Sequence, residues 1–251
     1  MSAKKETLGR TVGIVVAVCL VCSIIVSTAA VGLRSQQNAN ALLDKQTNIL
    51  EAAGLLQDAG GDITGTYAQL VEERFVDLSS GQYVEKDLGY DMYKAARDPE
   101  LSIKPQPDTA GIHRRANVAS VYLVKDQSGS VSRIVLPVHG SGLWNLMYGM
   151  LAIDNDGNTV RELVYYDQKE TPGLGGEVQN PQWKALWDGK KLFKDGEVAI
   201  NVKKGADAGN PYSVDALSGA TLTSNGVQNT LDYWLGENGF GPYLKKQPWK
   251  S

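Results

Sequence analysis

The sequence predicts an α+β fold in which an antiparallel sheet is flanked by helices and preceded by one N-terminal transmembrane helix. Three observations support this prediction. A long uncharged segment stands near the N-terminus, short strand patterns separated by turn sequences occupy the middle, and an amphipathic helical pattern follows them. Strands that are grouped in this way, without alternating helices, are typical of an antiparallel sheet.

The uncharged segment runs for 22 residues from Val12 to Leu33. As a helix it would span roughly 33 Å, about the thickness of the hydrocarbon core of a bilayer. The alternative is a cleaved signal peptide, for which Ser27 and Ala29 form a passable cleavage pair. Because the apolar region of a signal peptide is usually only about 7–15 residues long, we favour an uncleaved anchor over 12–33.

The basic residues around the anchor predict its orientation. Lys4, Lys5 and Arg10 precede the segment, whereas Arg34 alone follows it closely. The positive-inside rule then makes residues 1–11 a cytoplasmic tail and puts the rest of the chain outside. Both cysteines of the chain lie inside the anchor, so we expect no disulfide and no thiol or iron–sulfur chemistry in the exported part.

The composition is that of one globular domain with appendages. The chain has 251 residues, of which 42% are hydrophobic, and a net charge of -3. Charges of both signs are mixed, and no Lys/Arg run is long enough to follow a phosphate backbone, which argues against nucleic-acid binding.

The segment after the anchor predicts two helices and a connection. An apolar stripe predicts a helix over Gln36–Leu56, which Gly60-Gly61 would end. A second helix should start near Thr64, because apolar residues continue at helical spacing to Phe75. Ser79–Pro107 is polar and contains three prolines, so we expect a long connection with limited regular structure.

The middle of the chain predicts short strands and hairpins. Asp126-Gln-Ser-Gly and Asn155-Asp-Gly-Asn are turn sequences flanked by strand patterns. A short helix is expected at Pro181–Trp187, and an amphipathic helix at about Ser224–Leu235, before a Gly/Pro/Lys-rich tail. The predicted strands are Ser120–Val124, Arg133–Val138, Leu146–Asp154, Thr159–Asp167, Val198–Val202 and Tyr212–Ala216.

Small and hydroxylated residues gather where the last strand gives way to the last helix, in Asp215-Ala-Leu-Ser-Gly-Ala-Thr-Leu-Thr-Ser-Asn-Gly-Val. Gly219 and Ala220 would let a ligand approach the backbone, and the N–H groups at the helix start favour an anion. The same residues are also consistent with an ordinary helix N-cap, which local physics alone favours slightly.

Two glycine-rich loops are further candidates. Glu170-Thr-Pro-Gly-Leu-Gly-Gly-Glu-Val would project Leu174 from a tight loop that could clamp a flat ring, or it could be a plain connection. His139-Gly-Ser-Gly-Leu-Trp could present the indole of Trp144 to an aromatic ligand, or bury it in the core. We predict no metal site at His139, which has no partner cluster, and a solvated position for His113.

Three motifs together resemble the FMN-binding domain family. Ser218-Gly-Ala-Thr221, preceded by Asp215, is similar to the motif at which a flavin transferase uses FAD to attach FMN to the last threonine through a phosphoester. The loop that starts at Glu170 and the turn that ends at Trp144 match two further signatures, in the expected order. This co-occurrence favours a flavin site over the helix cap.

The full layout resembles the family of C subunits of the sodium-translocating NADH:quinone oxidoreductases. The nearest rival is the G subunit of Rnf-type complexes, in which a His often stands two residues before the signature Glu; this chain has Gln168 there. The resemblance implies four parts: a tail over 1–11, a transmembrane anchor over 12–33, a helical leader and connection over 34–109, and an FMN-binding domain over 110–251.

The resemblance implies covalent FMN on Thr221 and no catalytic residue or metal in this chain. Asp215 would serve the transferase. The other expected FMN-binding residues are Ser218, Gly219, Ala220 and Thr223 around the phosphate, and Glu170, Thr171, Gly173, Leu174, Gly175 and Trp144 around the ribityl chain and ring.

The implied function is electron transfer in a complex of the bacterial inner membrane that couples NADH oxidation by ubiquinone to sodium export. Its partners would be the other membrane, flavin and iron–sulfur subunits, with the flavin transferase during maturation, and the flavin domain would be periplasmic. The alternatives are a stand-alone or Rnf-type anchored flavoprotein that serves another acceptor, and an anchored assembly factor with an empty pocket.

Overall fold

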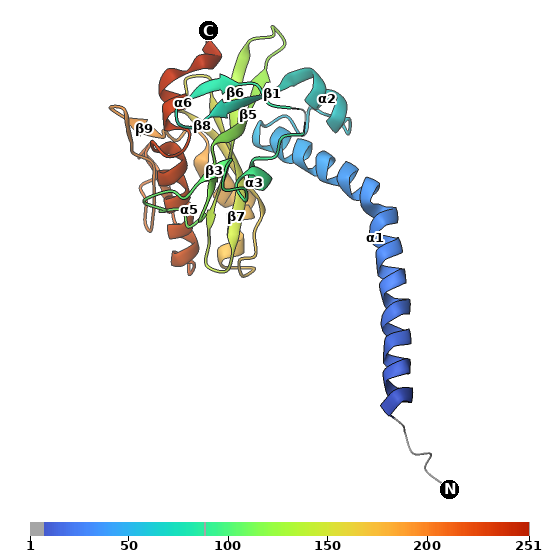
Figure 1. Cartoon of the computed structure of the whole chain (residues 1–251). Helices are drawn as coiled ribbons and strands as arrows, with labels where there is room; N and C mark the ends of the chain where they lie inside the picture. The colour runs from blue at the N-terminus through green and yellow to red at the C-terminus, as the bar shows by residue number, and fades with distance from the viewer. Residues whose placement is uncertain (1–7, 88, 251) are drawn as a thin grey trace. The chain divides into compact units, whose positions relative to one another are not determined.

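The computed structural model describes residues 8–87 and 89–250 (Figure 1). The chain divides into two compact units, Met1–Lys45 and Gln46–Ser251. Helix α1 (Leu8–Ala52) begins in the first unit and ends in the second.

Helix α1 is long and apolar enough to cross a membrane, with a mean hydropathy of 2.8 over its most apolar window. Its residues 8–44 are exposed, whereas Ile49 and Leu50 are fully buried in the second unit. The two predicted helical segments are therefore one continuous helix. Its end lies at Ala52 and not at Leu56, because Gly54 takes a left-handed backbone (φ +69°) that terminates the helix.

A six-stranded antiparallel sheet forms the centre of the second unit, in the order β2-β1-β5-β6-β7-β8. Its consecutive strands β5 to β8 form the two predicted hairpins. The predicted α+β class is confirmed. The strands are β1 (Val71–Asp77), β2 (Gln82–Val84), β5 (Val118–Lys125), β6 (Val131–Ser141), β7 (Leu146–Asp154) and β8 (Val160–Asp167).

The predicted helix from Thr64 to Phe75 is wrong beyond Leu70. Helix α2 (Ile63–Leu70) ends there, and the next residue opens β1. Strand β1 pairs with β5 along its whole length, from Val71 opposite Val124 to Asp77 opposite Val118. Apolar side chains at helical spacing also fit a half-buried strand, and here the partner strand decides between the two.

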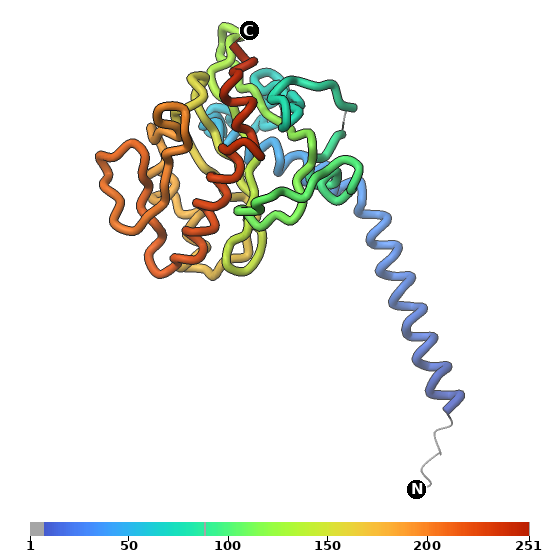
Figure 2. Tube along the Cα trace, turned by 60° about the vertical axis from the view of Figure 1, so that its left-hand side comes forward, coloured from blue at the N-terminus to red at the C-terminus, as the bar shows by residue number. Residues whose placement is uncertain are grey.

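The sheet buries two separate apolar faces. Helix α5 (Thr221–Leu235) packs through Val227, Leu231 and Trp234 into the larger cluster on one face. The end of α1 packs through Ile49 and Ala52 on the other. In Figure 2 the tube of α5 and of the helix that follows it, coloured orange-red to red, runs beside the central strands that carry the larger cluster. The sheet therefore has a helix packed on each of its two faces.

Several short elements complete the unit and correct one prediction, because the expected strand Val198–Val202 is split between β10 and β11. The expected connection over 79–107 contains the short elements β2, α3 and β3, and the tail contains the helices α6 and η3. The elements are α3 (Met92–Ala95), β3 (Ser102–Ile103), β4 (Arg115–Ala116), η1 (Gly175–Gln179), α4 (Pro181–Lys184), η2 (Ala185–Trp187), β9 (Phe193–Lys194), β10 (Glu197–Val198), β11 (Asn201–Lys203), β12 (Ser213–Asp215), α6 (Gly241–Lys246) and η3 (Pro248–Lys250).

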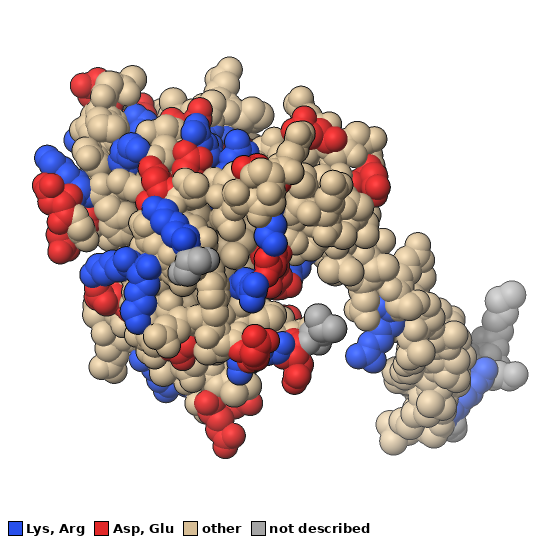
Figure 3. All heavy atoms as spheres, turned by 90° about the horizontal axis from the view of Figure 1, so that it is seen from above, with Lys and Arg blue, Asp and Glu red and all other residues tan. Residues whose placement is uncertain are grey.

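Contacts with other segments hold several of these short elements. Strand β3 pairs with β4, and β11 runs parallel to β12. Trp249, in the tail, donates its indole N–H to the carbonyl of Asn155 at 3.0 Å. Lys/Arg and Asp/Glu side chains are interleaved over the face shown in Figure 3, in keeping with the mixed charge of the sequence.

Candidate functional site

Three chain segments meet at the end of the sheet where β6 turns into β7. Residues 142–145 form the turn, which the N–H of Gly142 closes by donating to the carbonyl of Asn145 at 2.8 Å. The loop over 168–176 follows β8, and α5 begins at Thr221. These are the three motifs that the sequence indicates, and the fold brings them together.

The carboxylate of Glu170 joins the three segments. The backbone N–H of Trp144 donates to Glu170 Oε1 at 2.9 Å, and the hydroxyl of Thr223 donates to Glu170 Oε2 at 2.5 Å. Glu170 is only 5% exposed. One buried side chain therefore links the turn, the loop and the first turn of α5.

Glycines let the segments approach this closely. A Cβ on Gly142 would lie 2.6 Å from Glu170 Oε1, and one on Gly175 would lie 2.4 Å from the Thr223 hydroxyl. On α5, a Cβ on Gly226 would lie 2.3 Å from the carbonyl oxygen of Ser141. A side chain at any of the three positions would force its neighbours to move, so glycine is what allows the segments to pack this closely.

An exposed apolar rim surrounds the meeting point. The indole N–H of Trp144 donates to the Thr171 hydroxyl at 3.1 Å, yet the side chain is 68% exposed, so the alternative of a core Trp is wrong. Leu174 is also exposed, as predicted. Leu143 and Leu222 belong to the same rim and were not predicted, although both stand within the motifs. Apolar side chains gathered in this way are typical of a surface that receives a flat ligand or a partner.

Helix α5 starts three residues earlier than the sequence predicts. Its N-cap is Ala220, which makes no side-chain cap, so the interpretation of the hydroxyl residues as an N-cap is wrong. Instead the Ser224 hydroxyl accepts from the N–H of Leu217 and donates to the carbonyl of Ala220, both at 3.0 Å. Gly219 has φ +73°, and a Cβ there would lie 3.2 Å from a methyl carbon of Leu174.

The two threonines at the start of α5 differ in what their hydroxyls can do. Thr223 is 1% exposed and its hydroxyl is used by Glu170. Thr221 is exposed, and within 8–87 and 89–250 its hydroxyl has no hydrogen-bond partner. The first-turn N–H groups of a helix have no acceptor inside the helix, so they favour an anion beside Thr221.

Two polar residues near the motifs support the site from within the chain. Asp215 accepts the N–H groups of Gly205 and Ala206 at 2.7 and 3.3 Å, so its carboxylate organises the loop after β11. Gln168 accepts the N–H of Glu170 at 2.6 Å and donates to Gln179 at 3.1 Å. Gln168 thus fixes the backbone that carries Glu170.

The histidines lie outside the site. His113 is exposed, as predicted. His139 is 5% exposed and stacks on Tyr148 with ring centroids 5.4 Å apart. Burial lowers the pKa of His139 to about 4, so the ring is neutral at pH 7. No group of three His, Cys, Asp or Glu side chains among the described residues could hold a metal ion.

Comparisons with known proteins agree with this geometry. The FMN-binding domain family matches residues 142–236, which include all three motifs. The C subunit of the Na(+)-translocating NADH-quinone reductase of Yersinia pestis is 52% identical, over 96% of this chain and 93% of its own length. The protein of the same name from Vibrio vulnificus is 55% identical, over 97% of both chains.

Solved structures give the same result. The crystal structure of Shewanella oneidensis NqrC matches with a TM-score of 0.77 and 38% identity, over 80% of this chain and 95% of that one. The C subunit of the Na(+)-translocating NADH-quinone reductase of Parabacteroides distasonis matches with a TM-score of 0.67 and 30% identity, over 84% and 96%. With its three motifs assembled around Glu170, the chain belongs to the family of C subunits of the Na(+)-translocating NADH-quinone reductases.

Proposed function

We propose that this chain holds FMN through a phosphoester to Thr221 and transfers electrons within a membrane complex that couples NADH oxidation by ubiquinone to sodium export. The observation that carries the proposal is the state of Thr221 at the start of α5, whose exposed hydroxyl has no hydrogen-bond partner among the described residues. Thr223, its neighbour, is buried and already donates to Glu170. The two hydroxyls are thereby distinguished without reference to any relative.

The residues around Thr221 fit a flavin phosphate and ring. The first-turn N–H groups of α5 and the open backbone at Gly219 suit the phosphate. The exposed Trp144 and Leu174 suit an aromatic ring system. When bound, the flavin supplies the redox chemistry, and the protein supplies position and electrostatics. The proposed contacts are Ser218, Gly219 and Ala220 around the phosphate, and Thr171, Gly173, Leu174, Gly175 and Trp144 around the ribityl chain and ring, with the buried Glu170 and Thr223 supporting them from within the protein.

Attachment requires a flavin transferase with FAD as the donor. The Thr221 oxygen forms a bond to the phosphorus of the FMN half, the pyrophosphate bond of FAD breaks, and AMP leaves. The hydroxyl proton is released to a base. The exposed Thr221 hydroxyl suits this reaction, because no hydrogen bond within the described residues has to be broken and the transferase can reach it.

The anchor places this chemistry at the membrane. We propose a cytoplasmic tail over 1–11, a single inner-membrane span over 12–33, a leader over 34–109 and a periplasmic flavin domain over 110–251. The partners are the other membrane, flavin and iron–sulfur subunits of the complex. Membrane topology can be read from the protease sensitivity of the domain in spheroplasts and in inside-out vesicles.

Mass spectrometry of the full chain, co-expressed with the transferase, tests the attachment. We expect the mass of FMN, less one water, on the peptide that contains Thr221, and its absence from T221A. An unmodified wild-type peptide, or an adduct on Thr223, would overturn the assignment. Co-purification of the chain with the other subunits tests its place in the complex.

A further inference from the structure

The carboxylate of Glu170 is enclosed by the protein on every side that the contacts describe. Both of its oxygens accept hydrogen bonds from neutral donors, Trp144 and Thr223. A Cβ on Gly142 would lie 2.6 Å from Oε1, and one on Gly175 would lie 2.7 Å from Oε2. There is thus no room for a larger group against either oxygen on these sides.

Glu170 also lacks a cation within the part of the chain that is described. Among the ion pairs of residues 8–87 and 89–250 none involves Glu170, and the nearest lysine in sequence, Lys169, pairs with Asp167 at 3.3 Å. A buried carboxylate without a cation is costly, and two neutral hydrogen bonds offset only part of that cost.

We propose that Glu170 is a positioning residue that clasps the 142–145 turn to the start of α5 and keeps an unneutralised negative charge in the site, which lowers the reduction potential of the bound flavin. This proposal rests on the assignment of FMN to Thr221. It gives Glu170 a role that acts through Trp144 and Thr223, in place of a direct contact with the ribityl chain or ring.

The two parts of the role follow from the same geometry. Because both oxygens are taken by protein donors, the side chain can hold the rim residue Trp144 and the first turn of α5 in register. Because the carboxylate of Glu170 is buried, water and dissolved ions screen its charge only weakly. A fixed negative charge opposes the arrival of further negative charge, so electron addition nearby becomes less favourable.

Three substitutions separate the clasp from the charge. A glutamine at 170 can accept from the Trp144 N–H and donate to the Thr223 hydroxyl, so E170Q removes the charge and keeps both contacts. E170A removes both contacts and the charge. T223V removes one contact and keeps the charge. E177Q is the matched control, because Glu177 lies in the following turn, where it accepts from Asn180 at 2.5 Å.

The full chain would be co-expressed with the transferase, and two quantities would be measured: FMN occupancy of the Thr221 peptide and the midpoint potential by spectroelectrochemistry. We expect E170Q to keep near wild-type occupancy with a more positive potential. We expect E170A to lose occupancy several fold, T223V to lose less than E170A, and E177Q to match the wild type in both occupancy and potential. Thermal unfolding of the flavin-free proteins should rank E170Q above E170A.

Each contrary result counts against a stated part. An unchanged potential in fully loaded E170Q would overturn the role of the charge. An E170Q protein as empty as E170A, or an E170A protein as full as the wild type, would overturn the clasp. If the wild type itself carries no FMN on Thr221, the proposed function fails instead, and the unfolding order of the flavin-free variants still tests the clasp.

Discussion

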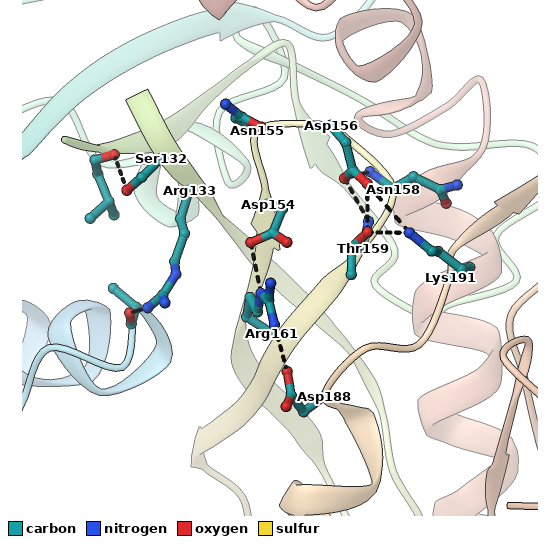
Figure 4. A network of polar contacts seen from close by, with 12 residues as sticks. Ser132, Arg133, Asp154, Asn155, Asp156, Asn158, Thr159, Arg161, Asp188 and Lys191 are labelled. Atoms are coloured by element: carbon teal, nitrogen blue, oxygen red, sulfur yellow. Dashed lines mark hydrogen bonds and ion pairs between the residues drawn. The ribbon is translucent and has the colours of Figure 1, made fainter. Parts of the chain in front are cut away.

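At one end of β7, ion pairs and hydroxyl hydrogen bonds hold the turn around Asp156, whereas at the other end the turn over 142–145 leaves the side chain of Trp144 exposed to solvent. Figure 4 shows the first of these ends. The Thr159 hydroxyl donates to Asp156 at 2.5 Å and accepts from Lys191 at 2.5 Å. Nearby, Arg161 donates to Asp154 at 2.7 Å and to Asp188 at 3.2 Å.

The difference between the two ends lies in how polar groups are satisfied. At the Asp156 end, both partners of each contact come from this chain, and each of the three carboxylates has a cation within 4 Å. At the Trp144 end, the described residues give one carboxylate no cation and one threonine hydroxyl no partner, and apolar side chains face solvent. A closed polar network serves the fold, and an open one is ready for a ligand.

The largest expected effect comes from replacing one threonine at each end with alanine. T221A should lose covalent FMN completely while changing the free energy of unfolding of the flavin-free chain by less than about 0.5 kcal/mol. T159A should keep FMN, and its free energy of unfolding should fall by about 1.5–3 kcal/mol, because the Thr159 hydroxyl bonds to the charged groups of Asp156 and Lys191. Mass spectrometry and denaturant unfolding measure both quantities. A stable, flavin-free T159A would contradict the comparison.

The next largest effect is the loss of stability at acid pH that His139 causes. The pKa of His139 is lowered by burial to about 4, against 6.5 in the unfolded chain. The unfolded chain therefore binds a proton below pH 6.5 that the folded chain refuses until about pH 4, so stability falls across this window by about 3 kcal/mol. Unfolding of H139F against pH should show a flatter profile, and H113Q should keep the wild-type profile. An unchanged slope in H139F would count against this assignment.

A smaller effect is expected when Gly175, which packs against Glu170 and Thr223, is replaced with alanine. The added methyl of G175A would meet the Thr223 hydroxyl at 2.4 Å, whereas that of G176A would first meet a carbonyl oxygen at 3.2 Å. Overpacking of this kind costs about 1–3 kcal/mol. G175A should therefore lower both thermal stability and FMN occupancy more than G176A does. Equal behaviour of the two variants would mean that the loop adjusts freely and that the clasp is not tight.

The smallest effect belongs to the closed end. Burial alone would raise the pKa of Asp156, but hydrogen bonds from Thr159 and Asn158 and the charge of Lys191 lower it to about 2. This carboxylate therefore contributes stability above about pH 4 that is lost as the pH falls towards 2. Because Asp156 is partly exposed, D156N should flatten the acid limb only slightly, and FMN occupancy at neutral pH should not change.

Much of the candidate site could be predicted because its signals are local. The anchor follows from length and hydropathy, and the hairpins follow from turn chemistry. The three glycine-rich motifs can be recognised without a fold, since each requires small residues at a fixed spacing. The preference for Thr221 over Thr223 came from a family motif and now has a local reason, because among the described residues one hydroxyl is free and the other is used.

Other features depend on partners far away in the chain. The segment from Val71 could be helix or strand until β5 lies beside it. The fate of Trp144, exposed or buried, depends on the turn that Glu170 holds from a position 26 residues later.

The sequence by itself thus determined the class of fold, a helix long and apolar enough to cross a membrane, and the motifs that meet in the candidate site, because hydropathy, turn preference and glycine content act over short stretches of chain. Only the tertiary structure decided what each site residue does, because hydrogen bonds and burial are set by neighbours that the sequence does not reveal. Glu170 shows this most clearly. The sequence indicates a glutamate at the start of the glycine-rich loop, but its role as a buried clasp depends on its hydrogen bonds with Trp144 and Thr223.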